Sequence, residues 1–218
     1  ALGGGSAADT TKGIALAVAE DGRVLDFVLE RAPDGRVISR QSTRPKLPIV
    51  AMVRPRAGSY VWAGDETRKM RADIDAMRGM ADGIVVGALD ESGRISHPIL
   101  WDLLMESGMP VNVLHRAFDE TPDPLEALDS ALVLGFRRLL TSGQAPTALE
   151  GADLIRRLIE RAAGRIEILP GAGIRSSNVA ELVRRTGCTQ VHGTFRDQAT
   201  GRCDEAEVRR VRAVLDSL

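Results

Sequence analysis

The sequence predicts an α/β fold in which short strands alternate with amphipathic helices, as in a parallel sheet or a (β/α) barrel. Short apolar runs begin at residues 48, 83, 111, 138, 166 and 190, so their starts lie 24 to 35 residues apart. Turn residues follow each run, and a stretch with apolar residues at helical spacing follows each turn. We therefore expect repeated βα units from about residue 48 onward.

The six runs are the predicted strands, and they cover residues 48–53, 83–89, 111–115, 138–141, 166–169 and 190–192. The helices are predicted over residues 65–81, 98–107, 124–134, 149–163, 176–186 and 205–215. Proline and glycine at the helix ends support these bounds, because Pro124 begins one helix and Gly108, Gly135 and Gly187 follow three of them. The sequence thus contains six βα units over residues 53–218.

The first 52 residues form a separate N-terminal segment in this interpretation. Residues 7–19 are a plausible helix, residues 23–30 fit a strand or a helix, Asp34 and Gly35 mark a turn, and residues 36–46 resemble a loop. A closed eight-stranded barrel needs about 250 residues. We therefore expect a barrel that is incomplete or atypical at its N-terminal end.

A balanced charge and an ordinary apolar content exclude several classes of protein. The 218 residues hold 29 Lys and Arg against 30 Asp and Glu, so no basic surface for nucleic acid or anionic membrane is expected. Aromatic residues make up only 3%, too few for a base-stacking platform. We find no signal peptide and no run near the roughly 20 apolar residues of a membrane helix. Two cysteines cannot build a disulfide framework, so we expect a cytoplasmic protein.

Polar side chains gather where the predicted strands end, which is where βα folds place their ligand chemistry. Arg54 and Arg56 follow the first strand, and arginine forks suit carboxylates and phosphates. His115, Arg116 and Asp119 follow the third strand. The hypothesis is that Arg54 and Arg56 clamp an anion beside Arg116, while His115 acts as catalytic base and Asp119 either orients it or pairs with an arginine. The alternative is structural: salt bridges for the arginines and a hydrogen-bonded interior histidine.

Two further turns could bind the same anion. Thr141, Ser142 and Gly143 follow the fourth strand and offer hydroxyl and backbone N–H groups. Gly171 and Gly173 follow the fifth strand, where they allow close backbone approach before a helix N-terminus. A tight turn without a ligand is the alternative for both.

Several motifs closely resemble the CutC family, which is named for copper homeostasis. They are MVRPRAG, DGIVVGAL, VLHRAFDETPDPLEAL, LLTSGQAPTALEG, LPGAGI and VHGTFR, in the family's order and spacing between residues 52 and 196. The resemblance implies a TIM-type (β/α) barrel. It also implies a copper-related function, although the acidic residues and the cysteine typical of the family's first two strands are absent here.

Copper itself is possible only through this resemblance. His115 and His192 both end predicted strands and could share a metal with a third ligand. Copper(I) prefers thiolate or thioether ligands. Cys188 is expected on the opposite rim and Cys203 before the last helix, so two structural cysteines are the simpler interpretation.

The N-terminal segment resembles a different family, the iron-containing alcohol dehydrogenases. Its ALGGGSAADTTK has their GGGS-x-x-D-x-x-K cofactor turn, and RPKLPIVAM resembles their next conserved segment. The residues that would contact NAD(P) are Gly3, Gly4, Gly5, Ser6, Asp9 and Lys12. NAD(P) binding is not expected, because the rest of the nucleotide site is missing. The pattern predicts a chimera with a junction near residues 48–53; the alternative is that the whole chain is CutC-like, because that family also has a Gly-Gly turn before the matching helix.

Four functions follow from these observations. The first is a CutC-like protein of copper homeostasis that binds a metal ion or a small anionic ligand at the barrel mouth. The second is an enzyme that transfers protons on an anionic substrate. The third is a remnant of an iron-dependent dehydrogenase, and the fourth is a fusion without function. Exposed sheet edges of an incomplete barrel predict a homo-oligomer.

Overall fold

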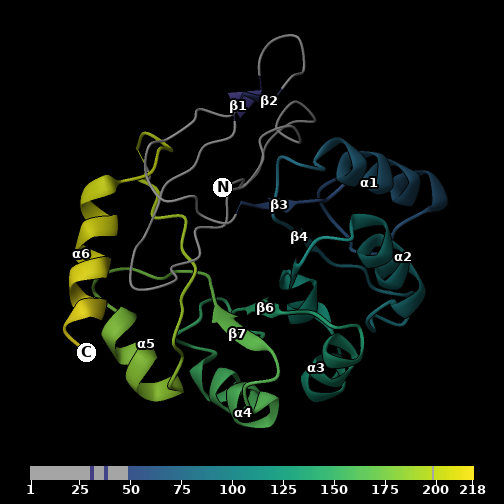
Figure 1. The fold of residues 1–218 in the computed structure, drawn as a ribbon. Helices are drawn as coiled ribbons and strands as arrows, with labels where there is room; N and C mark the ends of the chain where they lie inside the picture. Colours follow the sequence, from purple (N-terminus) through teal and green to yellow (C-terminus); the bar gives the residue numbers. More distant parts are fainter. Residues whose placement is uncertain (1–29, 32–36, 39–48, 198) are drawn as a thin grey trace.

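A computed structural model describes residues 30–31, 37–38, 49–197 and 199–218, and its centre is a parallel sheet of five strands. In sheet order these are β3 (Val50–Met52), β4 (Gly83–Val86), β5 (Val111–Leu114), β6 (Arg138–Thr141) and β7 (Glu167–Pro170). Helices connect successive strands and lie around the outside of the sheet (Figure 1). The predicted α/β class is confirmed, and the described strands form an open sheet that ends at β3 and β7.

The helices lie close to their predicted positions. They are α1 (Gly64–Ala76), α2 (His97–Ser107), α3 (Pro124–Val133), α4 (Ala152–Ala162), α5 (Val179–Thr186) and α6 (Glu205–Asp216). The largest difference is α1, which was predicted to continue to residue 81 but ends at Ala76. A turn follows in which Gly79 has a φ of 74°, a left-handed conformation that ends a helix.

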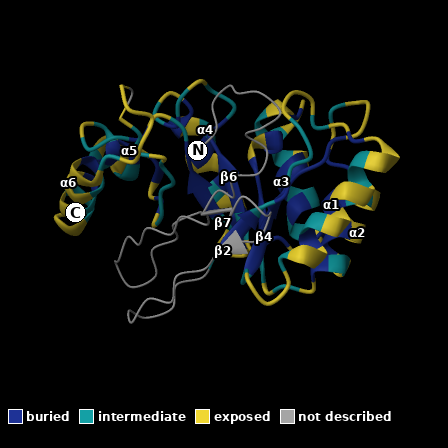
Figure 2. Cartoon of the chain, turned by 90° about the horizontal axis from the view of Figure 1, so that it is seen from above, coloured by how far each residue is buried: buried dark blue, intermediate teal, exposed yellow. Residues whose placement is uncertain are grey.

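Alternation along the strands divides the core into two layers. Ile84, Leu139 and Ile168 face the helices and belong to the larger apolar cluster. Val85 and Leu140 lie on the other face, in the smaller cluster of the inner side of the sheet. Figure 2 shows that buried residues follow the sheet and the inner sides of the helices, while exposed residues cover the outside.

The sixth predicted strand, residues 190–192, is reduced to a single bridge. The amide of His192 donates to the carbonyl of Pro170 at 2.8 Å, and His192 pairs in parallel with Gly171. α6 lies against α5, and its Glu207 carboxylate accepts from the amide of Ser176, just before α5, at 2.7 Å.

The N-terminal predictions fall mostly outside the described residues, including the helix over residues 7–19 and the turn at residues 34 and 35. The described part is a two-stranded antiparallel sheet of β1 (Glu30–Arg31) and β2 (Val37–Ile38). β2 corrects the predicted loop over residues 36–46. None of the described helices has the length and apolar content that crossing a membrane requires.

Candidate functional site

A cavity of about 560 Å³ opens at the carboxyl ends of the strands. Arg54 comes to it from the end of β3, His115 and Arg116 from the end of β5, and Gln144 from the end of β6. Gly171 after β7 and the bridge residue His192 also line it, and the other polar and glycine residues of the wall are Tyr60, Asp119, Glu120, Gly173, Arg175, Gly193 and Thr194. The structure therefore brings together strand ends that the sequence places up to 138 residues apart, from Arg54 to His192.

His115 is the most buried polar side chain of this cavity, with 3% of its surface exposed. Alternation after Val113 turns it to the inner face of the sheet. Its Nδ1 accepts the backbone N–H of Ala117 at 3.1 Å. The ring lies against β4 at Gly87, where a Cβ atom would be 2.3 Å from Cε1 and 2.4 Å from Nδ1. Only glycine leaves room for the ring there.

The hydrogen bond from Ala117 determines where His115 carries its proton. Because Nδ1 is the acceptor, the neutral ring has its proton on Nε2. Burial, and then the nearby Arg54 charge, lower the pKa of His115 to about 3. The predicted base therefore presents a proton rather than a lone pair, and Nε2 has no hydrogen-bond partner within the described chain.

Arg54 and His115 both contact the ring of Tyr60. The guanidinium carbon of Arg54 is 4.4 Å from the centroid of the Tyr60 ring, and that ring is 4.9 Å from the His115 ring, centroid to centroid. Arg54 Nη2 donates to the carbonyl of Gly58 at 2.7 Å. Its Nε is buried and has no partner among the described residues. Burial raises the pKa of Tyr60 above its usual value.

Arg56 does not share the cavity with Arg54, which corrects the predicted two-arginine clamp. Its guanidinium pairs with Glu66 in the first turn of α1, donates to the carbonyl of Val61 at 3.0 Å and stacks on Trp62 at 4.9 Å. The physical reason is that β3 ends at Met52, so strand alternation no longer fixes the direction of side chains after Pro55. Arg56 holds the loop to α1, as the structural alternative stated.

Asp119 is the centre of a hydrogen-bond network rather than the partner of His115. Its carboxylate accepts from the Thr141 hydroxyl, from the amide of Ser142 at 3.0 Å and from the amide of Gln144 at 3.2 Å. Arg116 Nε donates to it at 2.7 Å. With 8% of its side chain exposed, Asp119 is positioned to fix the turn after β6.

This network also accounts for the predicted donors at Thr141, Ser142 and Gly143, none of which lines the cavity. The amide of Gly143 donates to Thr141 Oγ1 at 2.8 Å. Ser142 Oγ lies 2.6 Å from the carbonyl of Ala145 and accepts from Arg116 at 2.9 Å. Their polar groups are thus used within the turn, which corrects the prediction that they contact a ligand. Arg116 itself remains at the mouth.

Gly171 and Gly173 line the cavity as the sequence predicts, and a carboxylate of α6 binds the turn between these glycines and α5. Glu207 accepts from both the amide of Ser176 and its hydroxyl, the latter at 3.0 Å. These bonds lower the pKa of Glu207, with the amide of Ser176 the largest cause. A carboxylate of the protein therefore occupies the place before α5 where an anion was predicted.

The two histidines of the predicted metal site both line the cavity. Burial lowers the pKa of His192 to about 4, so its ring is neutral at pH 7. Across residues 49–197 and 199–218, however, no three His, Cys, Asp or Glu side chains come together as a metal site. Cys188 lies elsewhere, buried after α5, and burial raises the pKa of its thiol. The cofactor residues Gly3, Gly4, Gly5, Ser6, Asp9 and Lys12 lie outside the described residues.

Sequence reasoning missed Tyr60, Arg175 and Phe195, which also line the cavity. Tyr60 is the only tyrosine of the chain and lies six residues after Arg54. Its place in the loop after the first predicted strand could have indicated that it belongs to the site. Arg175 Nη2 donates to the carbonyl of Arg196 at 2.9 Å, and the sequence contains no pattern that predicts this contact.

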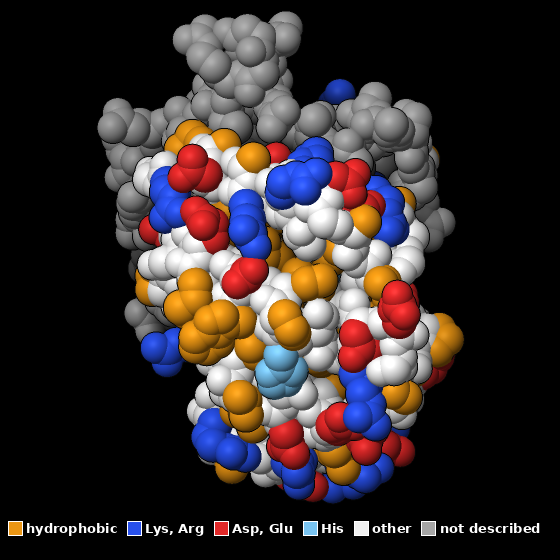
Figure 3. All heavy atoms as spheres, turned by 90° about the vertical axis from the view of Figure 1, so that its right-hand side faces the viewer, with side chains coloured by type: hydrophobic (Ala, Val, Ile, Leu, Met, Phe, Trp, Pro, Cys, Tyr) orange, Lys and Arg blue, Asp and Glu red, His pale blue; other side chains and the backbone are white. Residues whose placement is uncertain are grey.

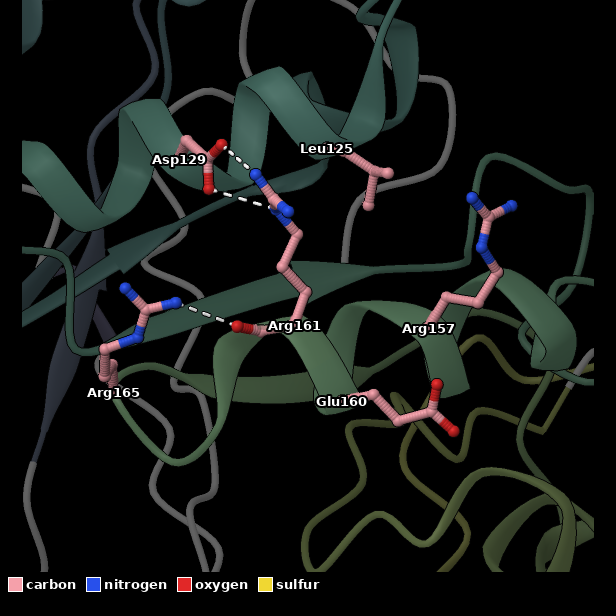
Figure 4. A pocket seen from close by; sticks show the side chains of 6 residues that line it. All are labelled: Leu125, Asp129, Arg157, Glu160, Arg161 and Arg165. Carbon is pink, nitrogen blue, oxygen red and sulfur yellow. Dashed lines mark hydrogen bonds and ion pairs between the residues drawn. The ribbon is translucent and has the colours of Figure 1, made fainter.

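A second hollow, of about 610 Å³, lies on the outer surface between α3 and α4 (Figure 4). Arg161 pairs with Asp129 there, and Arg165 donates to the carbonyl of Arg161 at 2.8 Å. These charged groups pair with one another at the surface, far from the strand ends that carry the candidate site. We assign no ligand to it.

The fold and the cavity define a protein of the (β/α) barrel type whose polar groups gather at the carboxyl ends of its strands, and structural comparison agrees. An aldolase structure aligns with a TM-score of 0.50 at 17% identity, over 69% of each chain, and shows the fold alone. The CutC protein of Streptococcus agalactiae aligns with a TM-score of 0.65 at 33% identity, over 68% of this chain and 73% of that one.

The chain belongs to the CutC family, whose sequence model matches residues 29–197. A family protein CutC of Caulobacter vibrioides is 39% identical over 192 residues, which is 86% of this chain and 78% of the relative. A human relative, named copper homeostasis protein cutC homolog, is 42% identical over 153 residues, or 69% of this chain and 56% of the relative.

The family match corrects the predicted chimera. It begins at residue 29 and therefore includes residues 29–52, which were predicted to resemble a dehydrogenase. Nothing in the comparisons supports a junction near residues 48–53.

Proposed function

We propose that this CutC family protein is a cytoplasmic protein of copper homeostasis that binds a small anionic ligand in the cavity at the carboxyl ends of its strands. The observation that carries the binding function is a pair of buried N–H groups, Arg54 Nε and His115 Nε2, that have no acceptor within the described residues. Both side chains belong to the wall of the same cavity.

Burial without an acceptor makes these two groups informative. A buried donor left without a partner costs about 1–3 kcal/mol, and more when the group is charged. Folded proteins satisfy nearly all such groups, so an orphaned pair in one cavity indicates a missing acceptor. One of the two belongs to a guanidinium, which favours an anion over a neutral ligand.

The link to copper homeostasis comes from the family and from the name of the human relative. A copper site within the cavity is the weaker form of the proposal. A histidine ligates through a lone pair, whereas His115 uses Nδ1 to accept from Ala117 and carries its proton on Nε2. The anionic ligand therefore agrees better with the donors present.

Anion binding is tested by isothermal titration calorimetry with a panel of small carboxylates and phosphates. We expect at least one of these anions to bind, and we expect Arg54→Gln to weaken it by about 10-fold or more, as loss of a charged hydrogen bond implies. The matched control is Arg157→Gln, which removes an exposed arginine of α4 outside the cavity. Retention of full affinity in Arg54→Gln, or no binding of any anion, contradicts the proposal.

A self-associating protein is a second, independent part of the proposal. β3 and β7 end the described sheet, where the bridge at His192 covers one end of β7, and open strand edges favour pairing with another chain. The face carried by α1 and α2 shows apolar side chains among charged groups of both signs (Figure 3). On α2, Trp101 and Met105 are 53% and 60% exposed.

A further inference from the structure

We propose that His115 is a neutral hydrogen-bond donor whose tautomer is fixed by Ala117, and that the ligand of the cavity is a carboxylate with an apolar body. The inference rests on the proposed function and names the chemical class of its anion. It also replaces the sequence prediction that His115 is a base.

The tautomer follows from geometry on three sides of the ring. Ala117 donates to Nδ1 at 3.1 Å, and Gly87 packs so closely on the ring that the ring has no room to tilt toward β4. Tyr60 covers a third side at 4.9 Å. Nε2–H is therefore the only polar group of the ring left to meet a ligand.

The hydrogen bonds that the turn after β6 already makes within the protein favour a carboxylate over a phosphate as the ligand. Barrel phosphate sites use backbone amides of glycine turns and helix N-termini. Here the amides of Ser142 and Gln144 donate to Asp119, and the amide of Gly143 donates to Thr141. These groups are not available to a phosphate.

At the turn before α5, a carboxylate of the protein already takes donors that a phosphate would use. Glu207 takes the amide and hydroxyl of Ser176 before α5, and a phosphate there would meet a carboxylate. Among the buried side-chain atoms of the cavity wall, two N–H donors, one of them cationic, have no acceptor in the described chain, and they match the two oxygens of one carboxylate.

The remaining lining indicates what the carboxylate is attached to. Met52, Leu140, Ile174 and Phe195 give the cavity an apolar wall. The Tyr60 ring contacts both Arg54 and His115, so a carboxylate that reaches their N–H groups also packs its body against this ring. A short hydrocarbon or aromatic acid fits this combination of two donors and an apolar wall.

Matched probes test the class of ligand. Benzoate and phenyl phosphate share one apolar body and differ in the anionic group, and both are titrated calorimetrically at pH 7. We expect benzoate to bind about 10-fold or more tightly than phenyl phosphate, with affinity lost in Arg54→Gln. Tighter Arg54-dependent binding of phenyl phosphate refutes the carboxylate but leaves the proposed function standing. If neither probe binds while another anion of the calorimetric panel does, the carboxylate with an apolar body is refuted and the proposed function stands; if no anion binds, both are refuted.

The tautomer is tested on the unmodified protein, so the result does not depend on whether a variant folds. We expect the ¹⁵N spectrum of the imidazoles to show His115 neutral, with its proton on Nε2, from pH 8 down to pH 6. Benzoate affinity should be constant over this range, because His115 and His192 are neutral throughout it and burial raises the pKa of Tyr60. The other charged side chains of the cavity wall are Arg54, Arg116, Asp119, Glu120 and Arg175. A proton on Nδ1, or an imidazolium at pH 7, refutes the assignment.

Variants give the independent check. His115→Gln retains a side-chain N–H donor and should keep benzoate affinity within about 3-fold, whereas His115→Leu should lose about 10-fold. His97→Gln, at an exposed position at the start of α2, is the matched control and should bind as the original protein does. Equal affinity in the Gln and Leu variants would show that the ring donates nothing.

Discussion

Gly87→Ala is the substitution that tests most directly how the site is built. A Cβ at this position would lie 2.3 Å from His115 Cε1, 2.4 Å from Nδ1 and 3.0 Å from the Cβ of Ala117. Ordinary contacts need more than an ångström of additional space, and a buried ring in a packed wall cannot move that far without displacing its neighbours. The ring must rotate away and release the Ala117 amide.

The cost can be assembled from its two parts. Overpacking a core costs about 1–3 kcal/mol, and losing a buried hydrogen bond costs about 0.5–1.5 kcal/mol. We therefore expect Gly87→Ala to lower the free energy of unfolding by about 3 kcal/mol, which for a chain of this length lowers Tm by about 6–12 °C. Carboxylate affinity should fall with it, because Nε2 loses its direction.

The assay is a thermal melt followed by circular dichroism, with urea unfolding for the free energy. Gly64→Ala is the matched control, because its added Cβ meets no atom within 4 Å and the residue begins α1. In a His115→Ala background, Gly87→Ala should cost far less, since the ring it strikes is gone. A melt of Gly87→Ala equal to that of Gly64→Ala would refute the contact and the fixed tautomer.

Three more predictions concern the residues around the cavity and the oligomeric state. Arg56→Ala should lower stability in urea unfolding because the contact with Glu66 is lost, and it should leave carboxylate affinity unchanged; a loss of affinity would restore the two-arginine clamp. Asp119→Asn should cost about 2–4 kcal/mol, since four donors lose a charged acceptor; stability equal to that of the original protein would contradict the network. Light scattering should give a mass of at least two chains, whereas a strictly monomeric species would contradict the self-association proposed from the sheet edges.

Acid should weaken the fold through His115, and the direction follows from its pKa. The folded ring has a pKa of about 3, while the unfolded ring has the ordinary value of 6.5. Between these values the unfolded chain binds a proton that the folded chain does not, so stability falls as pH drops from about 6.5 toward 3. Urea unfolding at pH 7 and pH 5 measures the loss. His115→Gln should show a smaller loss over the same interval, and an unchanged pH dependence would be inconsistent with a buried neutral ring.

The sequence predicted the fold well where local signals and tertiary packing agree. β6 coincides with its predicted range, residues 138–141, and α3 and α6 each differ from theirs by one residue at one end. The prediction was wrong where a strand-like segment does not pair along its length with a neighbouring strand. Residues 190–192 have strand-like composition, but only His192 pairs, because the chain then leaves the sheet for the loop before α6.

The site was harder to predict because residue type does not determine which atom is free. Strand ends correctly indicated that Arg54, Arg116, His115 and His192 meet at one mouth. Nothing in the sequence shows that Arg56 pairs with Glu66, or that the Asp119 carboxylate accepts hydrogen bonds from the turn after β6. These outcomes depend on where β3 and β6 end, to within a single residue.

The chemistry of the cavity is therefore determined largely by backbone amides that never face the ligand. The amide of Ala117 uses the lone pair of His115 and leaves a proton at Nε2, while the amides of Ser142 and Gln144 bind the Asp119 carboxylate, which therefore does not pair with the ring. A histidine next to an aspartate in the sequence usually indicates a base and the group that orients it. Here His115 becomes a hydrogen-bond donor and Asp119 stabilises the turn after β6. The resulting cavity favours binding an anion over abstracting a proton.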